Sequence, residues 1–282
     1  MRDYPDHIRT VVMDAPLPVE ANYDIESLEN LMRTYDRIFT DCEKDEACQA
    51  AFPNIRQKWK AFLQEKTDQP LEIKVVSPDT QDEKVFQIGG KDLVFLLAQM
   101  NNYTVGDILQ HIQSWLEGDY ALIEQKIKAQ FDPQYSGVGK GMRLSVWCAE
   151  ESPFVSQAQI DSASQAYPEI TGADPTVFSK SICEIWQVEA ARKIDNQAIK
   201  SDIPILILSG SYDNETPVHW AKSMLKNFSR GQHLIFEGYH HGATTYWNDP
   251  CGMQAACRFF QQPLLPINLP CLEAAKIPLK TD

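Results

Sequence analysis

The sequence lacks any long apolar run, which limits the classes of protein to which it can belong. None of its apolar runs approaches the roughly 18 residues that a membrane-spanning helix requires. Hydrophobic residues make up 43% of the chain and charged residues 23%, which is typical of a globular protein. We therefore expect no membrane partner, and 282 residues are enough to bury a substantial core.

Clusters of positive charge are also missing. The chain has 26 Lys and Arg residues against 39 Asp and Glu, which gives a formal net charge of −13, and its basic residues are scattered. Proteins bind nucleic acids largely through basic side chains that displace counterions from the phosphate backbone. The charge balance therefore argues against a nucleic-acid partner.

The cysteines lack the spacing of a metal site. Zinc sites usually show C-x-x-C pairs or histidines at fixed offsets, and neither pattern occurs around these seven cysteines. We therefore expect disulfides formed in an oxidising compartment, one unpaired thiol because the count is odd, and no metal or other cofactor. The spacing alone leaves the pairing open. The cysteines are Cys42, Cys48, Cys148, Cys183, Cys251, Cys257 and Cys271.

The features of a signal peptide are absent from the amino-terminal segment MRDYPDHIRTVVMDAP. This segment has no basic stretch that leads into an apolar helix and a small-residue cleavage site. Export of the protein would therefore have to be inferred from its cysteines.

The sequence does contain a change of pattern near residue 200. From 17 to 200, apolar residues recur mostly at helical spacing, and alternating residues at 71–76 and 84–88 predict a small hairpin. Beyond 200 the pattern is strand, helix, strand, helix, which is typical of α/β proteins. We therefore predict an α/β fold in which a core strand at 1–16 and a βαβα segment at 201–282 flank a large, mostly helical insertion at 17–200.

Two polar turns follow the strands of the βαβα segment. The run at 205–208 is apolar at every position, which predicts a strand buried on both faces, and Asp213 follows it. His240 and His241 follow the next strand, at 233–238. Because the carboxyl ends of neighbouring parallel strands meet at one edge of the sheet, we expect the carboxylate and an imidazole to lie side by side. Such a carboxylate orients the ring as the base of a hydrolytic triad, although an Asp in a turn also commonly caps that turn or the next helix.

The sequence lacks the nucleophile of such a triad. In α/β-hydrolases a serine in a G-x-S-x-G elbow precedes the acid and the histidine in the chain, and no such elbow occurs. Ser209 and Ser211 flank Gly210 without the required glycines, and Ser136 and Ser145 do not fit either. We therefore expect the chain to carry an acid and a base without their serine.

Six segments occur in the order found in one family of hydrolases. They are YPDHIRTVVMDAP, CEKDEAC, GMRLSVWCAEE, PILILSGSYDNETP, GYHHG, and CGMQAACRFFQQP with Cys271. With them, residues 4–271 resemble the carboxyl-terminal part of the secreted serine aminopeptidases of the α/β-hydrolase superfamily, the group of prolyl iminopeptidase and the tripeptidyl aminopeptidases with their TAP-like carboxyl-terminal domain. The resemblance implies the carboxyl-terminal part of an α/β-hydrolase sheet with a large helical cap at 17–200. It also implies that the chain begins just downstream of its serine elbow, so that the oxyanion hole would be missing too.

The resemblance assigns roles to the residues of the two turns. Asp213 matches the acid of the family's triad, and His241 matches the base. His240 stands where the family usually has glycine, which keeps His240 as the alternative base.

The resemblance also implies a pairing of the cysteines. The implied disulfides are Cys42–Cys48, Cys148–Cys183 and Cys251–Cys271. Cys257 would then be a buried free thiol on the final helix. Bridges of this kind imply a periplasmic or secreted protein.

Further residues of the implied cap are candidates for substrate binding. Glu150 and Glu151 match cap carboxylates that hold the free α-ammonium of a peptide, although two adjacent glutamates also fit a solvated helix end. Trp147 and Trp186 could line an apolar pocket for a prolyl or acyl group, but we expect both to pack in the core against the Cys148–Cys183 bridge instead.

The leading prediction is therefore a serine hydrolase. It would be an aminopeptidase that removes amino-terminal residues or short peptides, or a related esterase, and it would work through an acyl-enzyme. The alternative is a noncatalytic fragment or binding module that associates with a serine-bearing partner half, or with itself, through an exposed strand edge at 7–13.

Overall fold

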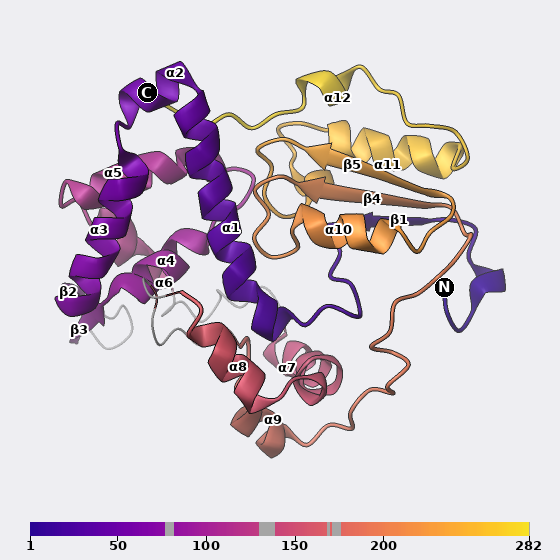
Figure 1. Ribbon diagram of the computed structural model, residues 1–282, viewed down its shortest axis with the longest axis horizontal. Coiled ribbons are helices and arrows are strands. Elements are labelled where there is room, and N and C mark those ends of the chain that lie inside the picture. The colour runs from indigo at the N-terminus through magenta and orange to yellow at the C-terminus, as the bar shows by residue number, and fades with distance from the viewer. Residues whose placement is uncertain (77–81, 130–138, 168–169, 171–175, 282) are drawn as a thin grey trace. The chain divides into compact units, whose positions relative to one another are not determined.

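The chain divides into two compact units. The computed structural model describes residues 1–281 apart from 77–81, 130–138, 168–169 and 171–175 (Figure 1). Unit 1 contains Met1–Asp41, Met100–Gly106 and Arg192–Leu279. Unit 2 contains Cys42–Gln99, Asp107–Ala191 and Lys280–Asp282. Residues 100–106 thus pack with unit 1, although they fall in the middle of the predicted insertion. The role of unit 2 as a cap stays a prediction.

Unit 1 is built on a three-stranded parallel sheet in the order β1-β4-β5 (Figure 1). The strands are β1 (Val11–Asp14), β4 (Ile205–Gly210) and β5 (Gly231–Phe236). Val11 pairs with Ile205, which in turn pairs with Gly231. All six residues of β4 are buried, because strands flank both of its edges and helices contact it, as its uniformly apolar sequence predicts. The parallel sheet with its helices confirms the α/β class.

Two helices contact this sheet. The helix α10 (Val218–Leu225) packs against β4 and β5, and α11 (Cys251–Gln261) contacts β4. Side chains alternate along β4, so that Leu206 and Leu208 point to the face opposite to the one that α10 covers. The core cluster beneath α10 contains Ile205, Ile207, Ala221, Met224 and Phe228.

The long helix α1 (Tyr23–Lys44) is amphipathic, as the pattern at 24–41 predicts. Its buried face contains Leu28, Leu31, Tyr35 and Ile38, which recur every three or four residues. The remaining elements of unit 1 are short. They are the 3-10 helices η1 (Pro5–His7) and η5 (Ala243–Thr245) and the helix α12 (Cys271–Ala274).

The strand predicted at 7–16 is shorter and less buried than the sequence suggests. Only Val11–Asp14 form β1, and all four residues are half-buried. One edge of β1 pairs with β4, and no strand within the described residues pairs with its other edge. The open edge explains the lower burial of β1 compared with β4.

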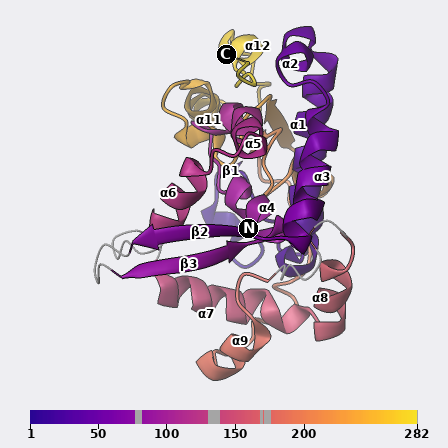
Figure 2. The same cartoon turned by 90° about the vertical axis from the view of Figure 1, so that its left-hand side faces the viewer.

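Within its described residues, unit 2 is helical apart from one antiparallel hairpin (Figure 2). The hairpin joins β2 and β3 with Leu71 opposite Ile88, close to the predicted bounds. Trp59 and Trp115 pack together in the core with ring centroids 5.9 Å apart. No helix in the described ranges is long and apolar enough to cross a membrane. The elements are α2 (Glu46–Ala51), α3 (Ile55–Asp68), β2 (Leu71–Val76), β3 (Glu83–Ile88), α4 (Gly90–Ala98), α5 (Ile108–Leu116), α6 (Ala121–Ala129), α7 (Lys140–Glu150), η3 (Ser152–Phe154), α8 (Gln157–Ser164) and α9 (Lys180–Trp186). The 3-10 helix η2 (Val105–Asp107) begins in unit 1 and ends in unit 2.

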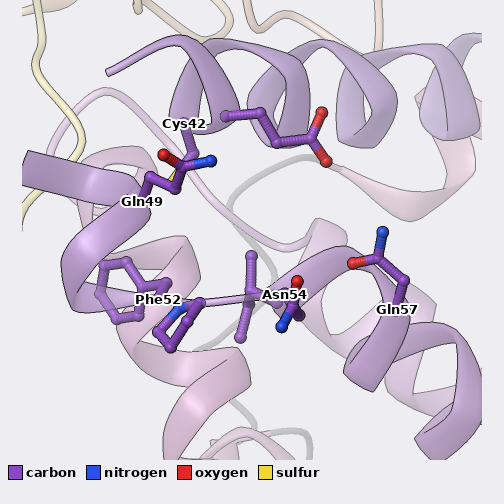
Figure 3. A pocket seen from close by; sticks show the side chains of 8 residues that line it. Cys42, Gln49, Phe52, Asn54 and Gln57 are labelled. Atoms are coloured by element: carbon purple, nitrogen blue, oxygen red, sulfur yellow. The ribbon is translucent and has the colours of Figure 1, made fainter. Parts of the chain in front are cut away.

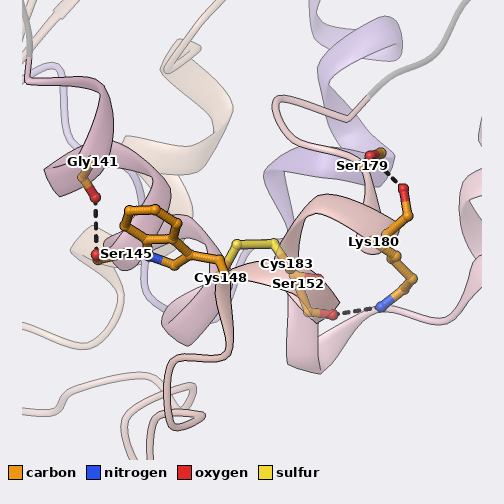
Figure 4. Close-up of a disulfide and its surroundings, with 9 residues drawn as sticks. Gly141, Ser145, Cys148, Ser152, Ser179, Lys180 and Cys183 are labelled. Carbon is orange, nitrogen blue, oxygen red and sulfur yellow. Dashed lines mark hydrogen bonds between the residues drawn. A yellow bond between two sulfur atoms is a disulfide. The ribbon is translucent and has the colours of Figure 1, made fainter.

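Three disulfides are present, with the pairing that the resemblance implied. Cys42–Cys48 and Cys148–Cys183 lie in unit 2, where the second joins α7 to α9 (Figure 4), and Cys251–Cys271 lies in unit 1. Each bridge typically contributes about 2–4 kcal/mol to stability. Such bonds persist in oxidising compartments, which is consistent with a secreted or periplasmic protein.

The expectation of a buried free thiol at Cys257 is wrong. Cys257 is free but exposed. The helix α11 buries Cys251, Ala255 and Phe259, which repeat every four residues. Cys257 falls between these positions on the helical wheel and therefore faces outward.

Candidate active site

The carboxyl ends of β4 and β5 bring two turns into contact. Ser211 N donates to Phe236 O at 3.0 Å, and Tyr212 N donates to Tyr239 O at 2.9 Å. Gly210 makes this approach possible, because a Cβ there would lie 2.2 Å from His240 O. Only glycine fits at such a distance. Backbone hydrogen bonds therefore join the turn after β4 directly to the turn after β5.

These turns place Asp213 beside His241. The Asp213 Oδ2 and His241 Nδ1 atoms are 3.0 Å apart. The Asp213 side chain is completely buried, whereas 40% of the His241 side chain is exposed. The structure thus brings the predicted acid to His241 and not to His240.

Asp213 is held by its own turn as well. Its Oδ1 accepts from Glu215 N at 2.8 Å and from Thr216 N at 2.9 Å, and its Oδ2 accepts from Thr216 Oγ1 at 2.7 Å. The turn-capping contact, which the sequence offered as an alternative, therefore coexists with the contact to His241. Burial raises the pKa of the Asp213 carboxyl, but the hydrogen bond and charge of His241 outweigh burial and leave the pKa below its ordinary value.

The environment of His241 favours the protonated form of its ring. Because Asp213 accepts at Nδ1, the Nδ1 atom carries a proton. Burial lowers the pKa of the imidazole, but the hydrogen bond and charge of Asp213, with the charges of Glu215 and Asp14, raise it to about 9. No group among the described residues hydrogen-bonds to Nε2, so this nitrogen is available to a substrate or a nucleophile.

His240 has a different environment. Its Nε2 lies 2.6 Å from Asn214 Oδ1 and therefore donates to it, which leaves Nδ1 buried without a hydrogen-bond partner. Burial lowers the pKa of His240 to about 4, despite the nearby charge of Asp213. His240 is therefore neutral at physiological pH, and its side chain hydrogen-bonds to Asn214 and not to Asp213.

Two residues that the sequence did not single out hold the turn that carries His241. Asn102 Oδ1 accepts from His240 N at 2.6 Å, and Asn102 Nδ2 donates to His241 O at 3.1 Å and to Gly242 O at 2.9 Å. Asp14, at the end of β1, accepts from Ala243 N at 2.9 Å and from Thr244 N at 2.7 Å. Asp14 could have been foreseen because it ends the third parallel strand at the same sheet edge. No local pattern marks Asn102.

The serines considered in the sequence have other partners. Ser209 Oγ lies 3.0 Å from His233 Nε2, and Ser211 Oγ accepts from Gly238 N at 2.7 Å. Ser145 belongs to unit 2 and donates to Gly141 O at 2.9 Å (Figure 4), while Ser136 lies outside the described residues. None of the described serines hydrogen-bonds to His241.

The candidate substrate-binding residues lie in unit 2. Glu150 is the last residue of α7 and is exposed, and Glu151 is the C-cap of that helix. Trp186 is 44% exposed, so its expected core packing is wrong, and its Nε1 donates to Ser145 Oγ at 3.0 Å. Trp147 is half-buried beneath the Arg143 guanidinium, which lies 5.8 Å from the ring centroid. The contact of these residues with a substrate stays a prediction.

Each unit contains a pocket. One of about 440 Å³ lies in unit 2, where Cys42, Gln49, Phe52, Asn54 and Gln57 line it together with three further residues (Figure 3). The other, of about 350 Å³, lies in unit 1 and has Asp213 in its wall. The described residues contain no group of three or more His, Cys, Asp or Glu side chains that could hold a metal ion.

Comparison with known proteins agrees with this geometry. Residues 171–271 match the model of an α/β-hydrolase family described as TAP-like protein. The matched range contains Asp213, His240 and His241 as well as the Cys251–Cys271 disulfide. A search of curated proteins gives no match. The family match supports an α/β-hydrolase TAP-like domain in the carboxyl-terminal part of the chain.

Proposed function

We propose, on the premise that residues 171–271 form a TAP-like α/β-hydrolase domain, that the protein provides the acid and the base of a serine hydrolase. The observation that supports this proposal is the 3.0 Å contact between the buried Asp213 carboxylate and His241 Nδ1. A histidine held in this way, with a free Nε2, is the acid–base half of a Ser-His-Asp triad.

The chemistry assigned to these residues has two stages. In the first, His241 Nε2 takes the proton of a serine hydroxyl while the serine oxygen attacks the substrate carbonyl, and His241 then gives that proton to the leaving amine or alcohol. In the second, His241 activates water in the same way, and the acyl-enzyme is hydrolysed. Asp213 stabilises the imidazolium in both stages and keeps the proton on Nδ1.

We place the missing serine on a nucleophile-bearing half that adds a parallel strand to the open edge of β1. An unpaired strand edge is a template for such pairing, and β1 is next to β4, which carries the acid. The protonated state of the His241 ring supports a second segment that covers the ring. With a pKa of about 9 the ring is protonated at neutral pH and cannot act as a base. A segment that covers the exposed ring would desolvate it, lower its pKa and convert it to the neutral base.

We further propose a peptide with a free amino terminus as the substrate, or a small ester. Glu150 and Glu151 are the carboxylates assigned to the substrate's α-ammonium group. The three disulfides support a secreted or periplasmic location.

A second candidate function is a noncatalytic binding module. The open edge of β1 supports it, because the same edge would pair with a partner half or with a second copy of the chain without any chemistry.

Hydrolysis measurements separate these functions. The chain is assayed with aminoacyl arylamides and with aryl esters, alone and after co-expression with the polypeptide encoded immediately upstream. We expect activity only in the pair, and we expect His241→Gln to reduce it by roughly 10⁴–10⁶-fold. His240→Gln is the matched control, and it should retain most of the activity.

Two results would contradict the proposal. Labelling of a serine in the chain alone by a fluorophosphonate probe would show that the nucleophile is already present. A stable complex with the upstream polypeptide that hydrolyses neither substrate, and that no fluorophosphonate labels, would favour the binding module.

A further inference from the structure

We infer that Asn102 is a positioning residue for His241, the base of the proposed function on which this inference rests. Asn102 does not touch His241's ring. It holds the backbone of the turn that carries the ring, from a segment that is remote in the sequence.

The side chain of Asn102 binds three consecutive residues of this turn. Its Oδ1 accepts from His240 N, and its Nδ2 donates to the carbonyl oxygens of His241 and Gly242, at 2.6, 3.1 and 2.9 Å respectively. Only 4% of Asn102 is exposed. The hydrogen bonds to His240 N and Gly242 O are buried and the one to His241 O is partly buried, so solvent replaces them poorly if the amide is removed.

The turn contains one residue with a left-handed backbone, which glycine adopts readily. Gly242 has a φ of 82°, which lies in the left-handed region. The residues next to Asn102 support the turn as well. Tyr103 Oη accepts from Trp247 N at 3.1 Å, and the Tyr103 ring packs edge-on against Tyr246 with centroids 5.0 Å apart. The segment Met100–Gly106 thus contacts the chain on both sides of η5, which explains why it packs with unit 1.

The position of the His241 backbone decides whether the ring reaches its acid. The contact between Asp213 Oδ2 and His241 Nδ1 is 3.0 Å long, and a displacement of about 1 Å would take it out of hydrogen-bond range. Asn102 holds the N–H of His240 and the carbonyl oxygens of His241 and Gly242. Removal of its amide takes this partner from His240 N and His241 O, whereas Gly242 O still accepts from Thr245 N at 3.3 Å and Thr245 Oγ1 at 2.9 Å. We therefore expect the turn to move at His240 and His241.

Asn102 also offers a clean test because it is neutral. The charged groups that act on the His241 ring are Asp213, Glu215 and Asp14, and the neighbouring His240 is neutral. Replacement of Asp14 would change both the position of the turn and the local charge. Replacement of Asn102 by a neutral residue changes the pKa of His241 only through geometry.

The experiment measures the pKa of the His241 ring by NMR titration in the wild type and in Asn102→Ala. Asn101→Ala is the matched control, because the Asn101 side chain binds only its own segment, at Tyr103 N and Thr104 Oγ1. Asp213→Asn gives the value expected when the acid is lost. Thermal unfolding of each variant reports whether it is folded.

We expect the pKa of about 9 in the wild type and in Asn101→Ala, and a value closer to 6.5 in folded Asn102→Ala. A fall of about one pH unit corresponds to a tenfold loss of proton affinity. An unchanged pKa in folded Asn102→Ala would overturn the inference and leave the proposed function intact.

Two further outcomes are also decisive. If Asn102→Ala fails to fold, Asn102→Gln, which keeps the amide but displaces it, takes its place with the same criteria. If both variants fail to fold, Asn102 stabilises the whole fold and has no specific role in positioning His241, and the inference is overturned. An ordinary pKa in the wild type would refute the contact between Asp213 and His241, and therefore the proposed function as well.

Discussion

The pairing of Asp213 with His241 predicts a pH-dependent contribution to stability, which the substitution Asp213→Asn removes. The amide keeps the shape of the side chain and can still accept from Glu215 N and Thr216 N. It loses the negative charge that raises the pKa of His241. In the variant, the effect of Asp213 no longer outweighs the effect of burial, which lowers the pKa of His241. We therefore expect that pKa at or below its ordinary value of 6.5.

The magnitude follows from the two pKa values. The difference between about 9 and 6.5 corresponds to a little over 3 kcal/mol, at about 1.4 kcal/mol per pH unit. The His241 side chain is 40% exposed, so solvent screens its interaction with Asp213. We therefore expect this interaction to contribute about 1–2 kcal/mol to stability. Because the pKa is raised in the folded state, this stability is fully present below 6.5 and is lost as the pH rises from 6.5 towards 9. The pKa of Asp213 is lowered in the folded protein. The contribution of this carboxylate to stability is therefore lost only in acid, as the pH falls below the ordinary range of a carboxyl group.

The assay is urea unfolding of the wild type and Asp213→Asn at about pH 6 and about pH 10, together with the NMR titration of His241. The difference in unfolding free energy between the two proteins should be larger at the lower pH, by about 1–2 kcal/mol. His240→Gln is the control, and it should leave the pKa of His241 close to the wild-type value. A difference in unfolding free energy that does not change with pH would refute the reasoning, even if Asp213→Asn were less stable at both values.

Other features of the structure give predictions that can be tested separately. Because Cys257 is exposed and the other six cysteines are bonded, a thiol reagent should label one cysteine in the native protein, and Cys257→Ser should abolish labelling; two or more labelled thiols would contradict the disulfides. Reduction under native conditions should lower the unfolding free energy by about 2–4 kcal/mol for each bridge broken, as denaturant titration would show. Gly210→Ala should destabilise the protein by about 1–3 kcal/mol and lower the pKa of His241, because the new methyl would meet backbone oxygens of the turn after β5; Gly139→Ala is the control, since its backbone suits alanine and a Cβ there would lie 4.0 Å from the Met142 side chain.

The sequence predicted the acid and base because each lies in a turn that follows a strand. Ile205–Leu208 are apolar without alternation, so the run could be assigned to a buried strand, and Asp213 and His241 then followed from the strand ends. The choice of His241 over His240 required the family motif at the sequence level. In the structure the two side chains differ in their contacts, because His240 Nε2 is bound to Asn214.

Other features depend on contacts that no local pattern encodes. Asn102 lies 138 residues from His240 and has an ordinary loop sequence around it. The cysteine pairing came from the family resemblance, because seven cysteines allow many pairings. The error at Cys257 was avoidable, since Ala255, Ala256 and Phe259 already mark the inward face of α11.

The separation of these residues along the chain has a consequence for folding. Asp213 and His241 are 28 residues apart, whereas Asn102 and His240 are 138 apart. Closing the longer loop costs about 1.4 kcal/mol more in chain entropy. We therefore expect the turns that carry Asp213 and His241 to meet early as the chain folds, while Asn102, which we propose positions the turn of His241, arrives late.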